Sequence, residues 1–299
     1  MNNKLIIICA SIVGAFLKVL CRLSIIKPSC GINNVKDRKK PVIISLTSYG
    51  RRVNQTVYCT IISLLRQSYK PDEVILWLDN ENWNSENIPL SLKKLKKSGL
   101  TIKFCDDMKS YKKLIPSLLS RPDCLIITVD DDIFYRKNMV ERLIRAYDNN
   151  PSMIYCHSAH GVSIDKKRGL LGYNKWEEDV AGTYGTLVFP VGEGGVLYDK
   201  NLLYNDISRA DLFTTLSPMA DDVWFFFMEL LKGTRSCELE RTSIFPYFPL
   251  DTFYQYIHKN ASLGQKNVGE NLNDRQIQAV MHYYGISVDC EKGEFIYPF

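Results

Sequence analysis

The sequence has no CxxC pair, no internal repeat and no low-complexity segment. Its nine cysteines are odd in number and scattered, so they predict reduced, mostly buried thiols in a cytosolic compartment, without a zinc site or a disulfide framework. The excess of 38 basic over 33 acidic residues is small and diffuse, which argues against nucleic acid as a partner. With 45% apolar and 24% charged residues, the chain is also too apolar for a disordered or fibrous protein.

The N-terminus lacks an apolar run long enough for a clear membrane span. The run at residues 5–17 reaches roughly 20 Å as a helix, short of a hydrocarbon core of about 30 Å. No small-x-small cleavage site stands out, and Lys18 and Arg22 follow where a cleavage region is usually uncharged. We expect residues 1–30 to form an interfacial or signal-anchor helix, with the body of the protein on the cytoplasmic side of the inner membrane. A buried helix and a signal peptide remain alternatives.

What the sequence does contain is an alternation of short β-branched runs and longer amphipathic stretches. This pattern predicts an α/β fold with a mostly parallel sheet flanked by helices, in one domain over residues 31–299. The expected strands lie at residues 42–47, 74–78, 100–105, 125–129, 153–156 and 196–198. The expected helices lie at residues 56–67, 90–97, 111–119, 137–147 and 218–231. We expect a long loop at residues 160–185, which are rich in glycine and charge.

Three acidic residues directly follow the strand expected at residues 125–129. Open α/β sheets bind ligands at the carboxyl ends of their strands, so this is the place for a site. Alternate side chains point the same way in extended backbone, so Asp130 and Asp132 can converge on one cation while Asp131 points elsewhere. Carboxylate oxygens suit Mg²⁺ or Mn²⁺, either of which would neutralise a diphosphate leaving group. A solvated acidic turn is the alternative.

Five stretches carry a resemblance to a known family, in the order ISLTSYGRR, SLLRQSYKPDEVILWLD, KSYKKLIPSL, LIITVDDDIFY and ADDVWFFF. Over residues 41–232 the chain resembles the family 2-like GT-A glycosyltransferases of bacterial capsule, LPS and O-antigen loci. The resemblance implies a Rossmann-like fold with the DxD motif after a central strand. It also implies a nucleotide-sugar half at residues 31–135 and an acceptor half at residues 136–299. The expected partners are a nucleotide-sugar donor, with a UDP-sugar favoured, a Mn²⁺ or Mg²⁺ cofactor, a glycan or lipid-linked acceptor, and a membrane surface.

The resemblance also implies roles for residues on the donor side. Thr47, Ser48 and Tyr49 would line the nucleotide pocket together with Asp131. Asp79 would contact the base or the ribose. A turn or capping carboxylate is the alternative for Asp79.

Two basic pairs are ambiguous. The resemblance suggests that Lys112 or Lys113, with Lys113 preferred, reaches the donor phosphates, a role that suits a compact positive charge. A solvated helix face is the alternative for both lysines. For Arg51 and Arg52 we expect surface placement.

A second acidic pair, Asp221 and Asp222, opens an apolar helix. An inverting transferase needs a carboxylate that removes the proton of the acceptor hydroxyl, and the resemblance places it here. We expect Asp222 to be this base, with Asp221 as the second candidate. A structural role is the alternative, because the helix dipole favours Asp at a helix N-terminus and Ser217 and Pro218 predict an N-cap and a first helical residue.

Further candidates lie downstream. The glycine-rich turn at residues 192–195 allows close approach to a ligand, and we expect Glu193 and Gly194 to bind the acceptor, although a hairpin turn is equally compatible. His258 is a candidate further metal ligand, which would favour Mn²⁺, but a lone histidine is more often packed or on the surface. Trp224 is expected in the core.

These observations favour a metal-dependent, inverting glycosyltransferase. One rival is a glycoside hydrolase with Asp132 and Asp222 as its acid/base pair, which does not explain why three carboxylates cluster after one strand. The other rival is a non-catalytic saccharide-binding or scaffolding protein that has kept the fold, since fold alone does not prove activity.

Overall fold

The computed structural model describes residues 3–29, 31–35, 38–178, 180–243, 247–258 and 271–298. Its centre is an eight-stranded sheet with the order β10-β13-β6-β12-β4-β1-β2-β3. These strands are β1 (Val42–Thr47), β2 (Glu73–Asp79), β3 (Leu100–Cys105), β4 (Leu125–Val129), β6 (Met153–Cys156), β10 (Tyr184–Gly185), β12 (Val196–Asp199) and β13 (Arg235–Glu238). Four two-stranded ribbons pair β5 (Ile133–Tyr135) with β14 (Tyr247–Pro249), β7 (Ala159–Gly161) with β11 (Val188–Pro190), β8 (Ile164–Asp165) with β9 (Gly169–Leu170), and β15 (Ser287–Asp289) with β16 (Glu294–Ile296).

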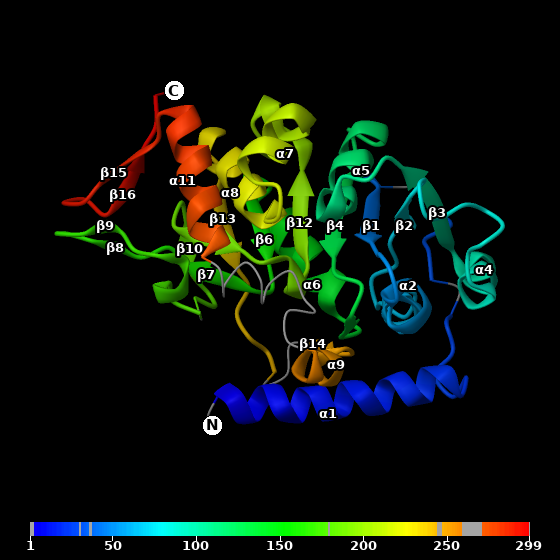
Figure 1. Ribbon diagram of the computed structural model, residues 1–299. Coiled ribbons are helices and arrows are strands. Elements are labelled where there is room, and N and C mark those ends of the chain that lie inside the picture. The colour runs from blue at the N-terminus through cyan, green and yellow to red at the C-terminus, as the bar shows by residue number, and fades with distance from the viewer. Residues whose placement is uncertain are drawn as a thin grey trace.

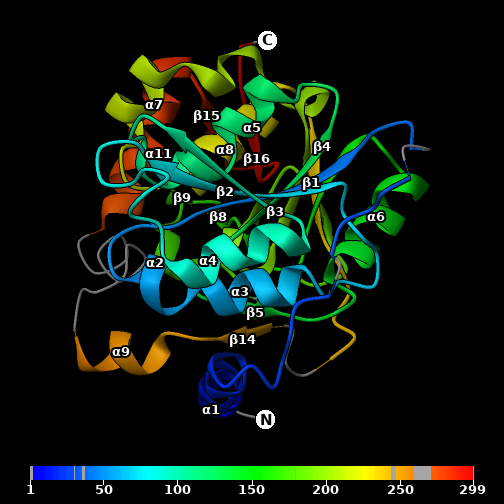
Figure 2. The ribbon, with the colours of Figure 1, turned by 90° about the vertical axis from the view of Figure 1, so that its right-hand side faces the viewer.

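The helices lie on both faces of the sheet (Figures 1 and 2). They are α1 (Asn3–Arg22), α2 (Arg52–Gln55), α3 (Val57–Leu64), α4 (Leu90–Leu95), α5 (Ile115–Ser120), α6 (Met139–Asn149), α7 (Ala210–Leu216), α8 (Asp221–Leu231), α9 (Thr252–Ile257) and α11 (Leu272–Tyr284). Successive residues of β1 point to opposite faces, so Ile43 joins the core under α5, α7 and α8, and Ile44 joins the core under α3 and α6. Trp224 lies fully buried in the first core, as predicted, and its indole N–H donates to the Ile207 carbonyl.

The direction of the strands confirms the predicted fold class. β1 runs parallel to both β2 and β4, and β2 runs parallel to β3. β12 is antiparallel to its neighbours β4 and β6, and β13 is parallel to β6. The chain therefore leaves β1 toward β2 on one side, while β4 lies on the other side. The carboxyl ends of β1 and β4 thus form the switch point at which open α/β sheets bind ligands.

Several predicted boundaries were wrong. Ser217 does not cap α8, because it follows the last residue of α7 and its hydroxyl donates to the Ala220 carbonyl. α8 accordingly begins at Asp221 and not at Pro218. The helix predicted at residues 111–119 is divided into a 3₁₀ helix, Lys109–Lys113, and α5.

The long loop predicted at residues 160–185 also contains regular structure. β7 pairs with β11, β8 with β9, and β10 adds an edge strand to the main sheet by pairing with β13. These strands are two or three residues long, too short to show an alternating pattern in the sequence.

α1 lies against the outside of the domain, next to β14 and α3 (Figure 1). A Cβ atom on Gly14 would lie 1.9 Å from the Pro249 carbonyl oxygen, so only glycine allows this close approach. Within the described residues, no helix combines the length and the apolar character needed to cross a membrane. The described cysteines are all free thiols.

Candidate active site

The switch point brings the residues after β1 beside the acidic run after β4. Leu46 of β1 lies opposite Val129 of β4, so both segments leave the sheet at the same edge. The Ser48 hydroxyl donates to Asp131 Oδ2 at 2.5 Å. The Thr60 hydroxyl of α3 donates to the Asp131 carbonyl at 2.9 Å. These contacts fix Asp131 against β1 and α3.

The predicted surface placement of Arg52 was wrong. Its side chain is only 13% exposed and pairs with Asp131 at 2.9 Å and with Asp132 at 3.1 Å. Asp251 lies 3.7 Å from Arg52 Nε and also pairs with Arg51, whose side chain is 27% exposed. Burial opposes the charge of Arg52, but the carboxylates outweigh burial and raise its pKa. We call these five residues, Arg51, Arg52, Asp131, Asp132 and Asp251, the arginine cluster.

A second group of charges surrounds Lys113. Its Nζ lies 2.9 Å from Asp221 Oδ2, 3.4 Å from Asp130 Oδ1 and 3.6 Å from Asp222 Oδ1. Burial opposes the charge of Lys113, but the three carboxylates prevail and raise its pKa well above the ordinary value. Lys112 and Lys113 are both buried, so the solvated-face alternative is wrong for both. We call Lys113, Asp130, Asp221 and Asp222 the lysine cluster.

Gly192 lies where the lysine cluster converges. A Cβ atom there would lie 2.5 Å from Lys113 Nζ, 3.2 Å from Asp222 Oδ1 and 3.5 Å from Asp130 Oδ1. Its backbone N–H donates to Asp222 Oδ2 at 3.2 Å. Glycine at this position therefore leaves room for Lys113 between the two acidic runs. The glycine-rich turn was predicted to allow close approach to a ligand, but no separate role was predicted for Gly192.

The two carboxylates that begin α8 differ in access. The Asp222 side chain is 26% exposed, compared with 10% for Asp221. Burial raises the pKa of Asp222 to about 7, with Lys113 opposing the shift and Asp221 adding to it. A general base works best when its pKa is near the operating pH. Asp222 is therefore the better suited of the two to remove a proton.

The acidic run has the chemistry of a divalent-cation site. Burial raises the pKa of Asp132 to about 7, with Arg52 opposing the shift and Asp131 and Asp130 adding to it. A cation would relieve this repulsion, and carboxylate oxygens are the ligands that Mg²⁺ and Mn²⁺ take. The described residues hold no group of three or more His, Cys, Asp or Glu side chains close enough to bind a metal ion. Asp130 and Asp132 would therefore need further oxygen ligands from water or phosphate.

The family model described as Glycosyl transferase family 2 matches residues 44–206, more than half of the chain. The chain belongs to this family. It is a glycosyltransferase of the GT-A fold, with a central, mostly parallel sheet flanked by helices. The matched residues include Arg52, Lys113, the acidic run and Gly192, whereas Asp221 and Asp222 follow them.

Two solved structures are similar to this family 2 glycosyltransferase at low identity. TarS 1-349 from S. aureus, in complex with UDP-GlcNAc, is 17% identical with a TM-score of 0.32, and the match covers 40% of this chain and 34% of TarS. The match thus spans about a third of the TarS chain. The mannosyltransferase PcManGT from Pyrobaculum calidifontis, in complex with GDP-Man and Mn2+, is 10% identical with a TM-score of 0.42, and the match covers 94% and 86% of the two chains. A search of curated proteins gave no match.

Four of the predicted donor residues of this family 2 glycosyltransferase lie at the ends of β1 and β2; they are Thr47, Ser48, Tyr49 and Asp79. Asp79 is buried, and its Oδ1 accepts from the backbone N–H of Asn82 at 2.8 Å and from its side-chain amide at 2.7 Å. This contact makes Asp79 a turn carboxylate, the alternative given above. The Thr47 hydroxyl donates to a carbonyl of β2, while Tyr49 is 45% exposed, with its ring 5.6 Å from the Arg52 guanidinium. The contacts of Thr47, Ser48, Tyr49 and Asp79 with the donor remain predictions.

The predicted acceptor residues are explained in part by packing. Glu193 Oε1 accepts hydrogen bonds from the hydroxyls of Tyr247 and Ser158, and burial raises the pKa of this carboxyl. A Cβ atom on Gly194 would lie 2.8 Å from the Ser158 nitrogen, so glycine is needed for close backbone packing. The roles of Glu193 and Gly194 in acceptor binding remain predictions.

A segment that the sequence prediction missed reaches Asp132 from the C-terminal side. β14 pairs with β5, and the Leu250 N–H donates to the Asp132 carbonyl at 2.7 Å. The Gln255 amide of α9 then donates to Asp132 Oδ2 at 3.1 Å. His258, just after α9, is exposed, with its ring 4.2 Å from that of Tyr254, and it joins no metal-binding group of described residues. Its metal role remains a prediction.

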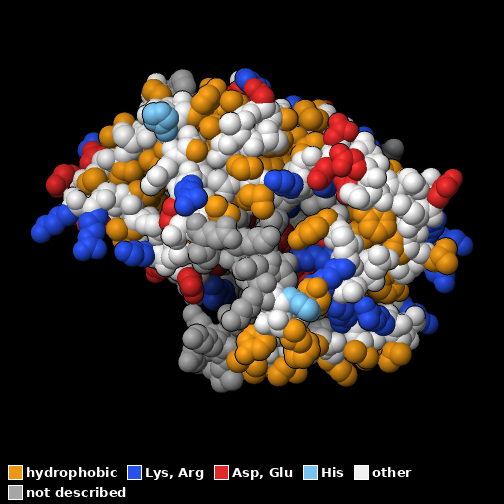
Figure 3. Space-filling view, in the orientation of Figure 1, with side chains coloured by type: hydrophobic (Ala, Val, Ile, Leu, Met, Phe, Trp, Pro, Cys, Tyr) orange, Lys and Arg blue, Asp and Glu red, His pale blue; other side chains and the backbone are white. Residues whose placement is uncertain are grey.

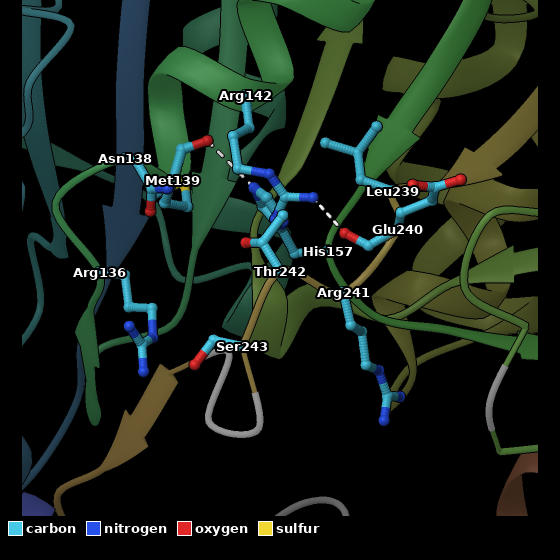
Figure 4. A pocket seen from close by; sticks show the side chains of 10 residues that line it. All are labelled: Arg136, Asn138, Met139, Arg142, His157, Leu239, Glu240, Arg241, Thr242 and Ser243. Carbon is cyan, nitrogen blue, oxygen red and sulfur yellow. Dashed lines mark hydrogen bonds between the residues drawn. The ribbon is translucent and has the colours of Figure 1, made fainter.

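A pocket beside α6 shares no residue with either charge cluster (Figure 4). His157 accepts from Arg142 through Nδ1 at 3.2 Å and donates from Nε2 to the Met139 carbonyl at 3.0 Å. Burial lowers the pKa of His157 to about 4, so the ring is neutral near pH 7. Arg136 and Arg241 extend away from this centre in Figure 4. His157 thus ties the end of β6 to the start of α6.

Proposed function

We propose that this family 2 glycosyltransferase is a metal-dependent, inverting enzyme of surface-polysaccharide biosynthesis. Its donor is a nucleotide-diphosphate sugar, with a UDP-sugar as the first choice, and its acceptor is a glycan or a lipid-linked glycan. One observation carries the proposal. Lys113 and Gly192 join Asp130 of the DxD motif to Asp222 at the switch point of the sheet.

On the donor side, Asp130 and Asp132 would hold Mn²⁺ or Mg²⁺, whose charge neutralises the diphosphate leaving group when bound. Arg52 holds Asp131 and Asp132 in place through its two ion pairs. Tyr49 offers an exposed aromatic ring beside Arg52 for the nucleotide. These residues would orient the donor so that its anomeric carbon faces the lysine cluster.

On the acceptor side, Asp222 takes the proton of the acceptor hydroxyl as that oxygen attacks the anomeric carbon. The new glycosidic bond forms on the face opposite the breaking bond, and the bonding electrons leave with the diphosphate oxygen. Lys113 favours the ionised form of Asp222, which is the form that accepts the proton. The Gly192 N–H fixes the orientation of the carboxylate.

We also propose that the enzyme works at the cytoplasmic face of the inner membrane and is held there peripherally through α1. The support is the apolar outer side of α1, on which Ile12 is 65% and Phe16 61% exposed. Lipid-linked acceptors are reached from the same surface.

Calorimetry of the full-length chain with UDP-, GDP- and CMP-sugars tests the proposal. We expect one nucleotide class to bind, only with Mn²⁺ or Mg²⁺ present, and to lose this binding in Asp132→Asn. Asp148→Asn, an exposed carboxylate on α6, is the matched control and should bind like the wild type. Absence of binding under all conditions would favour the saccharide-binding alternative, and glycoside hydrolysis that survives EDTA would favour the hydrolase.

A further inference from the structure

The outer side of α1 and Leu23, the residue after it, form an apolar stripe along residues 8–23. Its exposed side chains recur every three or four residues and are 51–66% exposed; they are Ile8, Ile12, Phe16, Val19 and Leu23. The inner side, with Gly14 and Cys21, packs against β14 and α3. A helix with one side in water normally carries polar residues on that side.

α9 lies beside α1 and continues this apolar surface (Figures 1 and 2). Phe253 is 77% exposed, Tyr256 83% and Ile257 57%. Lys18 of α1 donates to the Leu250 carbonyl at 3.4 Å, just before α9, which joins the two segments. Figure 3 shows hydrophobic side chains gathered along this edge of the molecule. We call the exposed apolar residues of α1 and α9 the α1–α9 face.

The charge around this face identifies what binds there. The first 36 residues contain five basic and no acidic residues, and residues 252–258 also contain no acidic residue. Arg22 and Lys27 are exposed at the end of α1. A second copy of the chain would bring two basic surfaces together, which is unfavourable. Anionic lipid headgroups complement both the charge and the apolar stripe.

The inner side of α9 contacts the arginine cluster. Asp251, the residue before α9, pairs with Arg51. The Tyr254 ring lies 3.2 Å from the Arg51 guanidinium carbon, and Gln255 donates to Asp132 at 3.1 Å. A helix of six residues is too short to be stable by itself, so contacts on its two sides decide whether it forms. A contact with its outer side therefore affects the residues that its inner side holds.

We propose that the α1–α9 face binds an anionic bilayer surface, and that α9 transmits this contact to the donor site by holding Arg51 and Asp132 in the donor-binding arrangement. Tyr254 and Gln255 are then positioning residues. The inference rests on the proposed function, because it requires a nucleotide-sugar site at Asp132. The contact between the α1–α9 face and the bilayer would make donor binding stronger on the membrane than in solution.

Co-sedimentation of the full-length protein with vesicles tests the surface. Phosphatidylcholine vesicles with and without phosphatidylglycerol are compared for the wild type, for Phe16→Ser combined with Phe253→Ser, and for Leu90→Ser. Leu90 is the matched control, because it is 73% exposed on α4 and lies outside the face. We expect binding to the anionic vesicles that weakens at least about tenfold in the double variant and is unchanged in the control. Equal binding of all three proteins, or dimers without vesicle binding, would overturn the assignment.

Donor affinity measured with and without the anionic vesicles tests the coupling. We expect the affinity of the wild type to rise several-fold with vesicles, and that of the Phe16→Ser and Phe253→Ser protein to stay at its vesicle-free value. Gln255→Ala should bind vesicles like the wild type but show a smaller rise. Equal donor affinity in both conditions, in protein that does bind vesicles, overturns the coupling and leaves the proposed function intact. Vesicle binding without donor binding in any condition contradicts the proposed function instead.

Discussion

The arginine and lysine clusters use the same acidic residue type but differ in charge balance. In the arginine cluster, three carboxylates face two guanidinium groups. In the lysine cluster, three carboxylates share the single ammonium of Lys113. Guanidinium groups bind carboxylates in a fixed planar geometry, whereas an ammonium is a point charge. The arginine cluster therefore fixes the positions of its carboxylates. The lysine cluster keeps an excess of negative charge that a cation or a proton can neutralise.

The largest expected effect is a loss of turnover when a carboxylate of the lysine cluster is replaced. Asp222→Asn should lower turnover by about 10²- to 10⁴-fold, the usual contribution of a general base, while donor affinity stays at the wild-type level. Steady-state kinetics and calorimetry on the same preparation measure both. Asp221→Asn is the control and should lose less turnover, because Asp221 is less exposed. Equal losses in the two variants would show that the base is not Asp222.

The next effect concerns stability. Lys113→Met should destabilise the fold by about 3–5 kcal/mol, because it leaves three carboxylates beside one another without a cation. Arg52→Met should destabilise the fold by less than Lys113→Met, since Arg51 still pairs with Asp251. Urea unfolding of both variants measures the difference, with Lys94→Met as the exposed control. If Arg52→Met lowers the free energy of unfolding as much as Lys113→Met does, the two clusters do not differ in charge balance.

A pH profile gives a smaller effect. Because the pKa of Asp222 is raised to about 7, its carboxyl is protonated below that pH and cannot accept a proton. With metal saturating, kcat/KM should fall about tenfold for each pH unit below about 7 and level off above it. The same raised pKa makes the contribution of Asp222 to stability fall as pH rises from about 4 to about 7. A profile that keeps this slope in Asp222→Asn would assign the titration to another group.

The smallest effect tests geometry at constant charge. Arg52→Lys keeps a cation beside Asp131 and Asp132 but cannot pair with both in one plane. We expect metal-dependent donor affinity to weaken by about tenfold or less, with a stability loss of about 1 kcal/mol. Lys113→Arg is the complementary exchange. Donor affinity unchanged in Arg52→Lys would mean that the arginine cluster needs only charge.

The sequence was sufficient where local patterns determine structure. The parallel strands appear as apolar runs because both faces of the sheet are covered, and β1 and β4 were predicted within a residue of their observed ends. Asp130, Asp131 and Asp132 were placed at the carboxyl end of β4 for the same reason, since they directly follow a buried strand. The expected grouping of Asp130 with Asp132 is not seen, because Asp131 and Asp132 share Arg52 while Asp130 contacts Lys113.

The remaining site residues depend on contacts that no local pattern shows. Arg52 resembles a surface residue in sequence, and only the pairing of β1 with β4 places it beside the acidic run. Gln255 reaches Asp132, and Asp251 reaches Arg51 and Arg52, through the pairing of β14 with β5, more than a hundred residues apart in the chain. The glycine-rich turn at residues 192–195 pointed to this place, but the role of Gly192 follows only from the positions of Lys113 and Asp222.

The close approach of Gly14 to Pro249 makes α1 part of the architecture of the catalytic domain. α1 covers β14, and Cys21 and Leu250 belong to the same buried core. Shortening the chain to remove an apolar leader, a common step in preparing soluble protein, would uncover that core and the strand that leads to α9. An inactive truncated preparation would then reflect a damaged enzyme. Its lack of activity would give no information about the sugars that the intact enzyme uses.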